Sequence, residues 1–582
     1  MRKLLVYLKD YKKESVLGPL FKLLEASFEL IVPLVMAAII DRGVAFKDKP
    51  YILKMCLVLV LLAAIGLVCS ITAQYFAAKA AVGFSTGLRH TLFEHMEKLS
   101  FSEMDTVGTS TLITRMTSDV NQVQNGVNLV LRLFLRSPFI VFGAMIMAFT
   151  IDVKAALVFV VAIPLLSVVV FGIMLISIPL YKKVQGALDK VLGITRENLT
   201  GARVIRAFNK EEDEIKEFNG HNEMLTAAQV YVGKISALMN PVTYVIVNGA
   251  IVALVWIGAL RVEGGAITQG EVVALVNYMS QILVELVKLA NLIININKSI
   301  ACGNRIQAVF ELESSIRDTG IPAGKTSGTE KEDGGFAVEF SHVGLTYAGA
   351  GDESLTDIHF AVKKGETVGI IGGTGSGKSS VVNLIPRFYE ATAGSVLVDG
   401  KDVREYSLKE LRDKVGVVLQ KAVLFKGTIR ENLAWGNGSA TEQEMAEALR
   451  IAQAKEFVET KEGGLDFEIE QGGKNLSGGQ RQRLTIARAL VKRPEILILD
   501  DSASALDFAT DAALRRAIRE MEGETTVFIV SQRAASIRHA DKIVVLDDGV
   551  IVGLGTHEEL LAGCEVYQEI YYSQFKKAAG GD

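Results

Sequence analysis

The first half of the chain is dominated by long apolar runs separated by polar stretches. The run from Ala156 to Leu180, for example, contains no charged residue. A membrane-spanning helix needs about 20 mostly apolar residues, and the pattern predicts six such helices. Their expected ranges are 16–40, 55–80, 129–150, 154–180, 238–260 and 270–293. So many long apolar segments in one half of a chain argue against the buried helices of a soluble protein.

The polar stretches between these segments predict the orientation of the chain. Those after the odd-numbered segments are short, whereas 81–128 and 181–237 are long and show helical patterns. The N-terminal segment is basic, with Arg2, Lys3, Lys9, Lys12 and Lys13. Because positive residues favour the cytoplasmic side, we expect the N-terminus, both long stretches and everything after the sixth segment to be cytoplasmic.

Charged residues interrupt several of the apolar segments. Three helical faces carry them: Lys22, Glu25 and Glu29 in the first segment, Arg132 and Arg136 in the third, and Glu285 and Lys288 in the sixth. A charge in hydrocarbon costs several kcal/mol, so these groups must face water or one another. The sequence leaves two interpretations open, the lining of a substrate cavity and internal ion pairs.

A phosphate-binding motif follows a strand-like run in the second half. Residues 372–379 read GGTGSGKS and fit the pattern G-x-x-x-x-G-K-[ST]. Small residues let backbone N–H groups surround phosphate oxygens, and the following helix adds its positive end. We expect Lys378 to contact the β- and γ-phosphates and Ser379 to bind Mg²⁺. The expected nucleotide-binding residues of this motif are Gly372, Gly373, Thr374, Gly375, Ser376, Gly377, Lys378, Ser379 and Ser380.

Composition divides the chain into three parts. Residues 313–335 are rich in Gly, Ser, Thr and charge, as linkers are. After them, strand and helix patterns alternate as in an α/β fold. We expect a transmembrane domain at 1–312, a linker at 313–335 and a nucleotide-binding domain at 336–582.

Four motifs in order give this second half a family resemblance. Residues 475–483 read NLSGGQRQR and residues 495–501 read EILILDD, with Gln420 between them and the phosphate motif, and Tyr347 upstream. Over residues 336–575 the chain resembles ATP-binding cassette (ABC) transporters. The fold implied is an all-α six-helix transmembrane domain of the exporter type followed by an α/β P-loop domain. One cassette and six spans imply half of a dimer in a lipid bilayer.

The resemblance also implies roles for single residues. Tyr347 would stack on adenine, while Asp500 and Gln420 would join Ser379 around Mg²⁺. A signature motif would hold the γ-phosphate of ATP on the opposite subunit, and its residues here are Ser477, Gly478, Gly479 and Gln480, with Asp507 also serving that site. Short coupling helices are expected near Ser100–Asp105 and near Arg206–Asn209.

Two positions depart from the family pattern. Asp501 stands where the family has its catalytic glutamate, and Gln532 stands where it has a switch histidine. Asp is one methylene shorter than Glu, and a misplacement of about 1 Å can cost roughly a hundredfold in rate. Glutamine cannot carry the positive charge of a protonated imidazole. The pattern resembles the degenerate-site subunit of bacterial heterodimeric multidrug exporters, and an active homodimer with two tolerated substitutions is the alternative.

The expected function is therefore ATP-driven export of amphiphilic molecules, multidrug or lipid-like, across the bacterial inner membrane, with ATP and Mg²⁺ bound on the cytoplasmic side. The expected partner is a second half-transporter. A homodimeric lipid flippase and an ATP-gated channel are the alternatives. The net charge of −4 gives no general affinity for nucleic acid. The cysteines, Cys56, Cys69, Cys302 and Cys564, show no metal-binding spacing.

Overall fold

The computed structural model describes residues 2–318, 335–521 and 523–575, which form two compact units. The first unit comprises Met1–Glu97 and Ser110–Glu311, and the second comprises Lys98–Thr109 and Leu312–Asp582. A short segment between two long helices thus packs with the C-terminal half of the chain. Most of the predicted linker at 313–335 lies outside the described residues.

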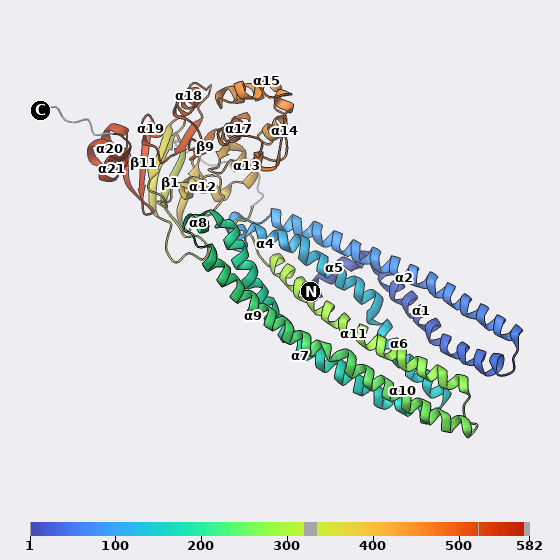
Figure 1. Cartoon of the computed structure of the whole chain (residues 1–582). Coiled ribbons are helices and arrows are strands. Elements are labelled where there is room, and N and C mark those ends of the chain that lie inside the picture. The colour runs from blue at the N-terminus through green and yellow to red at the C-terminus, as the bar shows by residue number, and fades with distance from the viewer. Residues whose placement is uncertain (1, 319–334, 522, 576–582) are drawn as a thin grey trace. The chain divides into compact units, whose positions relative to one another are not determined.

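The described residues of the first unit form helices joined by short turns (Figure 1). Among the described residues, six helical stretches are long and apolar enough to cross a membrane: Lys3–Val44, Lys49–Glu97, Thr109–Ile151, Val153–Thr200, Glu211–Glu263 and Gln269–Phe310. Each predicted apolar segment lies within one of them, so the prediction of a six-helix transmembrane domain is confirmed. The α-helices are α1 (Lys12–Ala38), α2 (Lys49–Glu97), α4 (Thr109–Thr114), α5 (Val120–Leu129), α6 (Arg136–Ile151), α7 (Val153–Thr200), α8 (Ala202–Ala207), α9 (Glu211–Ala237), α10 (Met239–Glu263) and α11 (Gln269–Phe310).

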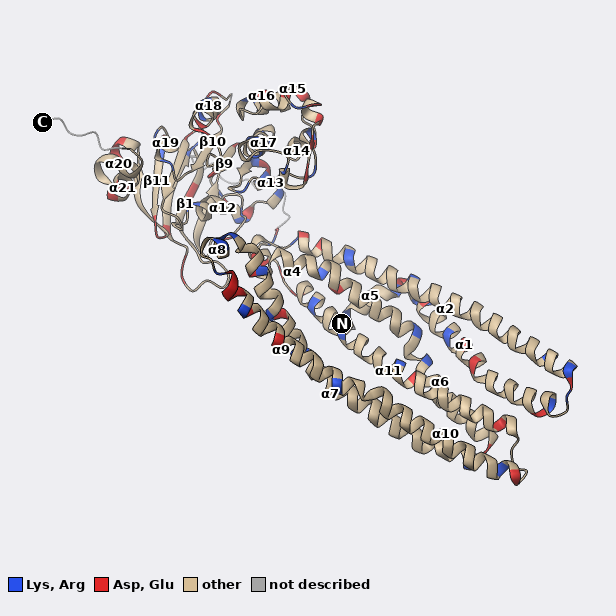
Figure 2. Ribbon diagram, viewed as in Figure 1, with Lys and Arg blue, Asp and Glu red and all other residues tan. Residues whose placement is uncertain are grey.

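Small residues bring these helices close together. Ala26, Ala144, Ala156 and Ala274 are fully buried in one core shared by α1, α6, α7, α10 and α11. In hydrocarbon, where apolar side chains gain nothing by leaving lipid, such close approach of helices is a main source of stability. Long stretches of α2, α7 and α10 carry no charge, as Figure 2 shows, and their apolar side chains suit contact with lipid.

The start of α11 is fixed to the end of α1. Asp41 accepts hydrogen bonds from the Gly270 amide (2.8 Å) and the Thr268 hydroxyl (2.5 Å). A Cβ at Gly270 would lie 2.4 Å from the carbonyl oxygen of Ala37, so only glycine permits this contact. Thr268 and Glu271 form a capping box that satisfies the first amides of α11.

Six of the seven charged residues predicted within the spans pair with one another, whereas the buried Nε of Arg132 has no hydrogen-bond partner among the described residues. Lys22 bonds Glu25 on α1, while Arg136 of α6 bonds both Glu29 of α1 and Glu285 of α11. Internal ion pairing, one of the two interpretations of these residues, is therefore observed. It does not exclude the other, because a pair can also border a cavity.

The two long polar stretches contain the predicted helical extensions. In the first, α2 continues to Glu97 and is followed by α3 (Phe101–Val107), at the place expected for a short connecting helix. In the second, the short helix α8 ends at Ala207, so it lies about one turn earlier than the predicted position at Arg206–Asn209. The reason is Asn209, whose φ of 51° ends the helical run.

The described residues of the second unit contain three sheets. A six-stranded sheet has the order β12-β11-β3-β10-β9-β6 and is parallel except for β12, and a four-stranded antiparallel sheet has the order β2-β1-β4-β5. The strands are β1 (Phe336–Leu345), β2 (Leu355–Lys363), β3 (Thr367–Gly372), β4 (Ala393–Val398), β5 (Lys401–Asp402), β6 (Val415–Val418), β7 (Gly427–Thr428), β8 (Glu468–Ile469), β9 (Ile496–Asp500), β10 (Thr526–Val530), β11 (Lys542–Asp547) and β12 (Val550–Gly555). Strands β7 and β8 form the small third sheet. The α/β prediction is confirmed.

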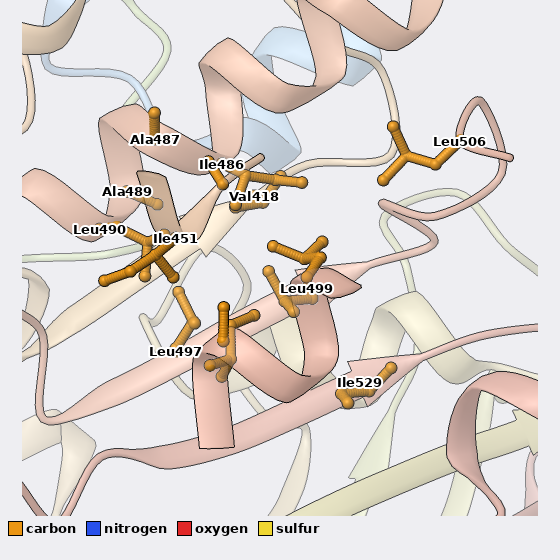
Figure 3. Close-up of a cluster of buried hydrophobic side chains, with 14 of the residues drawn as sticks. Val418, Ile451, Ile486, Ala487, Ala489, Leu490, Leu497, Leu499, Leu506 and Ile529 are labelled. Carbon is orange, nitrogen blue, oxygen red and sulfur yellow. The ribbon is translucent and has the colours of Figure 1, made fainter. Parts of the chain in front are cut away.

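Helices cover the six-stranded sheet. They are α12 (Lys378–Leu384), α13 (Leu408–Lys414), α14 (Ile429–Ala434), α15 (Glu442–Ile451), α16 (Lys455–Glu459), α17 (Gly478–Val491), α18 (Phe508–Arg519), α19 (Ala534–Ile537), α20 (His557–Gly563) and α21 (Glu565–Gln574). Alternate residues of each buried strand enter different cores, as the two-residue period of a strand requires. Leu497 and Leu499 of β9 face a core shared with Ile486 and Leu490 of α17 (Figure 3), whereas Ile498 joins the other core.

Candidate functional site

A cleft of about 290 Å³ opens at the carboxyl ends of β3, β9 and β10. Ligands of open α/β sheets bind at this edge, where the loops after the strands converge. The cleft brings together most of the predicted site residues. Its lining is Tyr347, Ser354, Thr374, Gly375, Gly377, Lys378, Ser379, Ser380, Gln420, Asp500, Asp501, Val530, Ser531 and Gln532.

The loop between β3 and α12 has a backbone that only glycine adopts readily. Gly375 and Gly377 have φ values of 87° and 90°. A Cβ at Gly373 or Gly375 would meet no atom within 4 Å, so the backbone there is open to a ligand. The buried Ser376 closes the loop by donating its hydroxyl to the carbonyl of Gly373 (2.9 Å). The loop therefore offers accessible backbone to a phosphate group.

Lys378 projects into this loop from the first turn of α12. Its ammonium is buried and donates to the carbonyls of Gly372 (3.0 Å) and Gly373. Burial lowers the pKa of Lys378, and the nearby carboxylates of Asp501 and Asp500 oppose that shift. A buried ammonium held by neutral carbonyls gains a stronger partner when a phosphate enters the loop.

Ser379 and Asp500 provide oxygen atoms at the floor of the cleft. The Ser379 hydroxyl donates to Oδ1 of Asp500 at 2.9 Å. Asp500 is buried at the end of β9, and this burial raises its pKa. A hydroxyl and a carboxylate at hydrogen-bonding distance, beside a phosphate-binding loop, are hard ligands of the kind that Mg²⁺ prefers. These two residues would fit a magnesium ion.

Gln420, Asp501 and Gln532 line the same cleft. Nε2 of Gln420 lies 3.5 Å from Oδ2 of Asp501, a long hydrogen bond. Asp501 has a φ of 43°, and its amide donates to the carbonyl of Val530 (3.0 Å), which fixes its backbone. Gln532 is exposed and lines the same cleft. The two departures from the family pattern thus lie in one site.

Gln574 of α21 holds the backbone next to Gln532. Its Oε1 accepts a hydrogen bond from the Ala534 amide (2.9 Å), and its Nε2 donates to the Gln532 carbonyl (2.7 Å). Gln574 could not be predicted from the sequence, because no motif marks it and it lies 42 positions beyond Gln532.

Tyr347 borders the cleft but makes contacts other than the predicted one. Its hydroxyl lies 2.8 Å from Oγ of Ser380, and its ring meets that of Tyr389 edge-on at 5.0 Å. Burial raises the pKa of both tyrosines. The stacking of Tyr347 on adenine stays a prediction.

Helix α3 packs beside this tyrosine pair within the second unit. The Phe101 ring lies 4.9 Å from that of Phe388, and the Tyr389 hydroxyl donates to Oδ2 of Asp105 at 2.6 Å. A capping box between Ser100 and Glu103 begins the helix. A series of contacts thus runs from α3 through Tyr389 to Tyr347. The position of α3 was predicted from the sequence, but its contacts with Phe388 and Tyr389 were not.

The signature residues form a second, separate group. Ser477 is the N-cap of α17, whose first residues are Gly478, Gly479 and Gln480, and its side chain and that of Gln480 form a capping box. Ser477 and Gly478 are exposed, and none of these residues lines the cleft. Asp507 caps α18 by accepting from the Thr510 amide (2.9 Å), and its pKa is lowered by this hydrogen bond. The motif therefore presents an accessible helix N-terminus away from its own cleft.

Comparison with known families assigns both halves of the chain. Residues 15–286 match the ABC transporter transmembrane region, and residues 355–504 match the ABC transporter family. The chain is 37% identical over 580 residues to an uncharacterised ABC transporter ATP-binding protein of Mycobacterium tuberculosis, covering 99% of this chain and 98% of the relative.

Other relatives carry more specific names. A Bacillus subtilis protein, provisionally named a multidrug export ATP-binding/permease protein, is 32% identical, with 99% of each chain covered. An ATP-dependent lipid A-core flippase of Desulfotalea psychrophila is 32% identical over 84% of each chain. The structure of a bacterial Atm1-family ABC exporter with ATP bound has the same fold, with a TM-score of 0.79, 23% identity, and coverage of 97% of this chain and 100% of that one.

Proposed function

Because this chain belongs to the ABC transporter family, we propose that it pairs with a second half-transporter and contributes a weak ATP site to the pair. The chain itself is an exporter-type half-transporter, a multi-pass membrane protein and an ATPase coupled to transport. The domain limits proposed for it are 1–312 for the transmembrane domain, 313–335 for the linker and 336–582 for the nucleotide-binding domain.

The cleft is the proposed ATP site. The backbone of the loop before α12 and the ammonium of Lys378 hold the β- and γ-phosphates, and Tyr347 contacts the adenine. Ser379, Asp500 and Gln420 would hold Mg²⁺, which neutralises phosphate charge when bound. Hydrolysis further requires a carboxylate that positions water against the γ-phosphate.

The observation that carries the weak-site proposal is the arrangement of Asp501 and Gln532 in one cleft. Nε2 of Gln420 lies 3.5 Å from the Asp501 carboxylate, and the Asp501 amide donates to the Val530 carbonyl. Because Asp is one methylene shorter than Glu, we expect its carboxylate to fall short of the position that a glutamate would occupy. Gln532 supplies no cationic group to the γ-phosphate. The site is therefore expected to retain ATP and to cleave it slowly.

The signature group supports a different role at the opposite site. Ser477–Gln480 and Asp507 match the family pattern and lie outside this chain's own cleft. They would complete the site of a partner that has the missing glutamate and histidine. ATP would close the two cassettes on each other, and hydrolysis at the partner's site would reopen them.

The cargo proposed is an amphiphilic small molecule leaving the cytoplasm across the bacterial inner membrane. The names of two relatives, a multidrug exporter and a lipid A-core flippase, support this class. A homodimeric lipid flippase is the second candidate, and the relative named as a lipid A-core flippase supports a lipid cargo.

Nucleotide retention after turnover tests the asymmetric pair. The assembled transporter in lipid nanodiscs is incubated with radiolabelled ATP and Mg²⁺, passed through a desalting column and assayed for bound ATP and ADP. We expect about one uncleaved ATP to stay with each pair, and Lys378→Ala in this chain to abolish that retention.

Complete conversion of all bound ATP to ADP would contradict the weak site. Purification of the transporter from its native membrane as a pair of identical chains would favour the flippase alternative. ATP-driven accumulation of a fluorescent lipid or drug in inside-out vesicles tests export itself.

A further inference from the structure

A cavity of about 540 Å³ lies in the first unit between α1, α6 and α11. Helix α1 contributes Glu29, Val32, Pro33 and Met36, helix α6 contributes Ile140, and helix α11 contributes Asn277, Ser280, Gln281, Val284, Glu285 and Lys288. One part of the lining is therefore apolar, and the rest offers charges, amides and a hydroxyl. Mixed linings of this kind suit ligands that have both an apolar part and a polar headgroup.

Four charged residues beside this cavity form a row of alternating sign. Lys288 bonds Glu285 at 2.9 Å, Glu285 bonds Arg136 at 2.8 Å, and Arg136 bonds Glu29 at 2.7 Å. The order is thus positive, negative, positive, negative, and the net charge is zero. We call these four residues the charge row.

The two ends of the charge row are exposed and its middle is not. The side chains of Arg136 and Glu285 are 8% and 4% exposed, whereas those of Glu29 and Lys288 are 43% and 46% exposed. The Ser137 hydroxyl completes the middle by donating to the second oxygen of Glu285 at 2.8 Å. Structural ion pairing accounts for the two buried members, but it leaves a half-exposed carboxylate and a half-exposed ammonium at the cavity.

Another ion pair on α1, Lys22 with Glu25, is mostly buried and gives a comparison for the charge row. Lys22 bonds both oxygens of Glu25, and their side chains are only 8% and 17% exposed. That pair satisfies itself and offers no charge to a ligand. The charge row differs because each end has only one ionic partner in the described residues.

A second feature of the lining points to a polar ligand. Oε1 of Gln281 is buried and has no hydrogen-bond partner among the described residues. A buried acceptor without a partner is destabilising unless water supplies a donor or a positively charged group of a ligand lies beside it. Gln281 lines the same cavity as both ends of the charge row.

We propose that this cavity binds amphiphiles with a zwitterionic headgroup, whose cation pairs with Glu29 and whose anion pairs with Lys288. Such a ligand gives both ends of the row a second partner and leaves the site neutral. A cationic or an anionic amphiphile pairs with one end only and gives the site a net charge. The apolar tail lies along Val32, Met36 and Ile140.

This inference rests on the proposed export function and narrows its cargo. It is tested with four probes that share an octyl chain and differ in headgroup: octyl sulfobetaine is zwitterionic, octyltrimethylammonium cationic, octyl sulfate anionic and octyl glucoside uncharged. Dissociation constants are measured by calorimetry on the full-length, assembled transporter in nanodiscs, without ATP, and empty nanodiscs provide the correction for lipid partitioning. Octyl sulfobetaine should bind about tenfold more tightly than any other probe.

Two substitutions remove one end of the row each. Glu29→Gln should weaken the binding of octyl sulfobetaine by about tenfold and leave the binding of octyl sulfate unchanged. Lys288→Gln should weaken the binding of octyl sulfobetaine to a similar extent and leave the binding of octyltrimethylammonium unchanged. Glu263→Gln and Lys49→Gln, which alter exposed charges at the ends of α10 and α2, are the matched controls and should preserve the wild-type order of the probes.

Equal binding of all four probes to the wild-type protein would overturn the proposal, as would unchanged affinities in both end variants. If an end variant does not fold, Glu29→Asp and Lys288→Arg keep the charges and must keep the order of the probes. ATP-driven accumulation of a fluorescent amphiphile in vesicles is measured on the same preparations. Accumulation with an altered probe order defeats only the zwitterion claim, whereas the expected order without any accumulation defeats the export function.

Discussion

Among single residues, the proposed weak ATP site depends most on whether the Asp501 carboxylate reaches the position that a catalytic glutamate would occupy. Asp501 is fixed at its backbone by the Val530 carbonyl and bonds Gln420 through its side chain. A group that does not act as the base in the wild-type protein can be neutralised with little effect on rate. A working base cannot.

Asp501→Asn should therefore lower the ATPase activity of the assembled transporter by no more than about twofold. Turnover of ATP at saturation in nanodiscs gives the rate. A decrease of about tenfold or more would identify Asp501 as a working base and remove the weak site from the account.

Lys378→Ala should weaken nucleotide binding at this chain's own site by roughly 10- to 100-fold. The reason is the loss of charged hydrogen bonds to phosphate, which contribute about 1.5–3 kcal/mol. The affinity is measured by titration with a fluorescent ATP analogue in the absence of Mg²⁺, so that no hydrolysis occurs. Lys409→Ala, an exposed lysine of α13, is the control and should bind as the wild type does. Equal affinities for the two variants would show that the loop holds phosphate without its lysine.

The sequence predicted the residues of the cleft well because they belong to continuous motifs. Gly372–Ser380 act through a local backbone conformation, and Asp500 ends an apolar strand, so local pattern was sufficient. Tyr389 and Gln574 could not be found in this way. Their partners lie 284 and 42 positions away, and only the folded chain brings those atoms together.

At the scale of elements, α21 acts as a clamp on the loop after β10. Gln574→Ala removes both of its hydrogen bonds to the backbone of residues 532–534 and should lower the free energy of unfolding by about 1–2 kcal/mol. Hydrogen exchange should become faster at residues 531–535.

The control for this clamp is Gln568→Ala on the same helix, whose side chain bonds the Leu561 carbonyl instead. It should leave exchange at residues 531–535 unchanged. Similar hydrogen exchange at residues 531–535 in the two variants would mean that α21 does not hold this loop in position.

Helix α3 gives a second prediction at this scale. Tyr389→Phe removes the hydroxyl that bonds Asp105 but keeps the ring contact with Tyr347. Hydrogen exchange across residues 98–109 should therefore become faster. Tyr347→Phe removes only the bond to Ser380 and should leave that exchange unchanged. The opposite ranking would place the main support of α3 elsewhere.

The elements themselves were predictable wherever one physical pattern dominates. Runs of apolar residues identified all six membrane helices, since hydrocarbon excludes charge over a fixed length. The short helix α8 was placed too late because its end depends on the backbone of Asn209, a local choice that hydrophobic pattern does not report. The pairing of Arg136 with both Glu29 and Glu285 depends on three helices that meet only in the fold.

In the whole transporter, we propose that this chain's site retains ATP and that the partner's site hydrolyses it. This chain supplies an intact signature group and an accessible α17 N-terminus, but its own cleft has a short acid and an uncharged switch residue. Two copies would bring together two weak sites. A copy and a suitable partner would bring together one weak and one competent site.

The most direct test is the ATPase activity of this chain purified and reconstituted alone, compared with that of the double variant Asp501→Glu with Gln532→His. We expect slow turnover for the wild-type chain and an increase of about tenfold or more in the variant, because the signature group needed to complete each site is already present. Vigorous turnover by the wild-type chain alone, with no gain in the double variant, would contradict the division of labour.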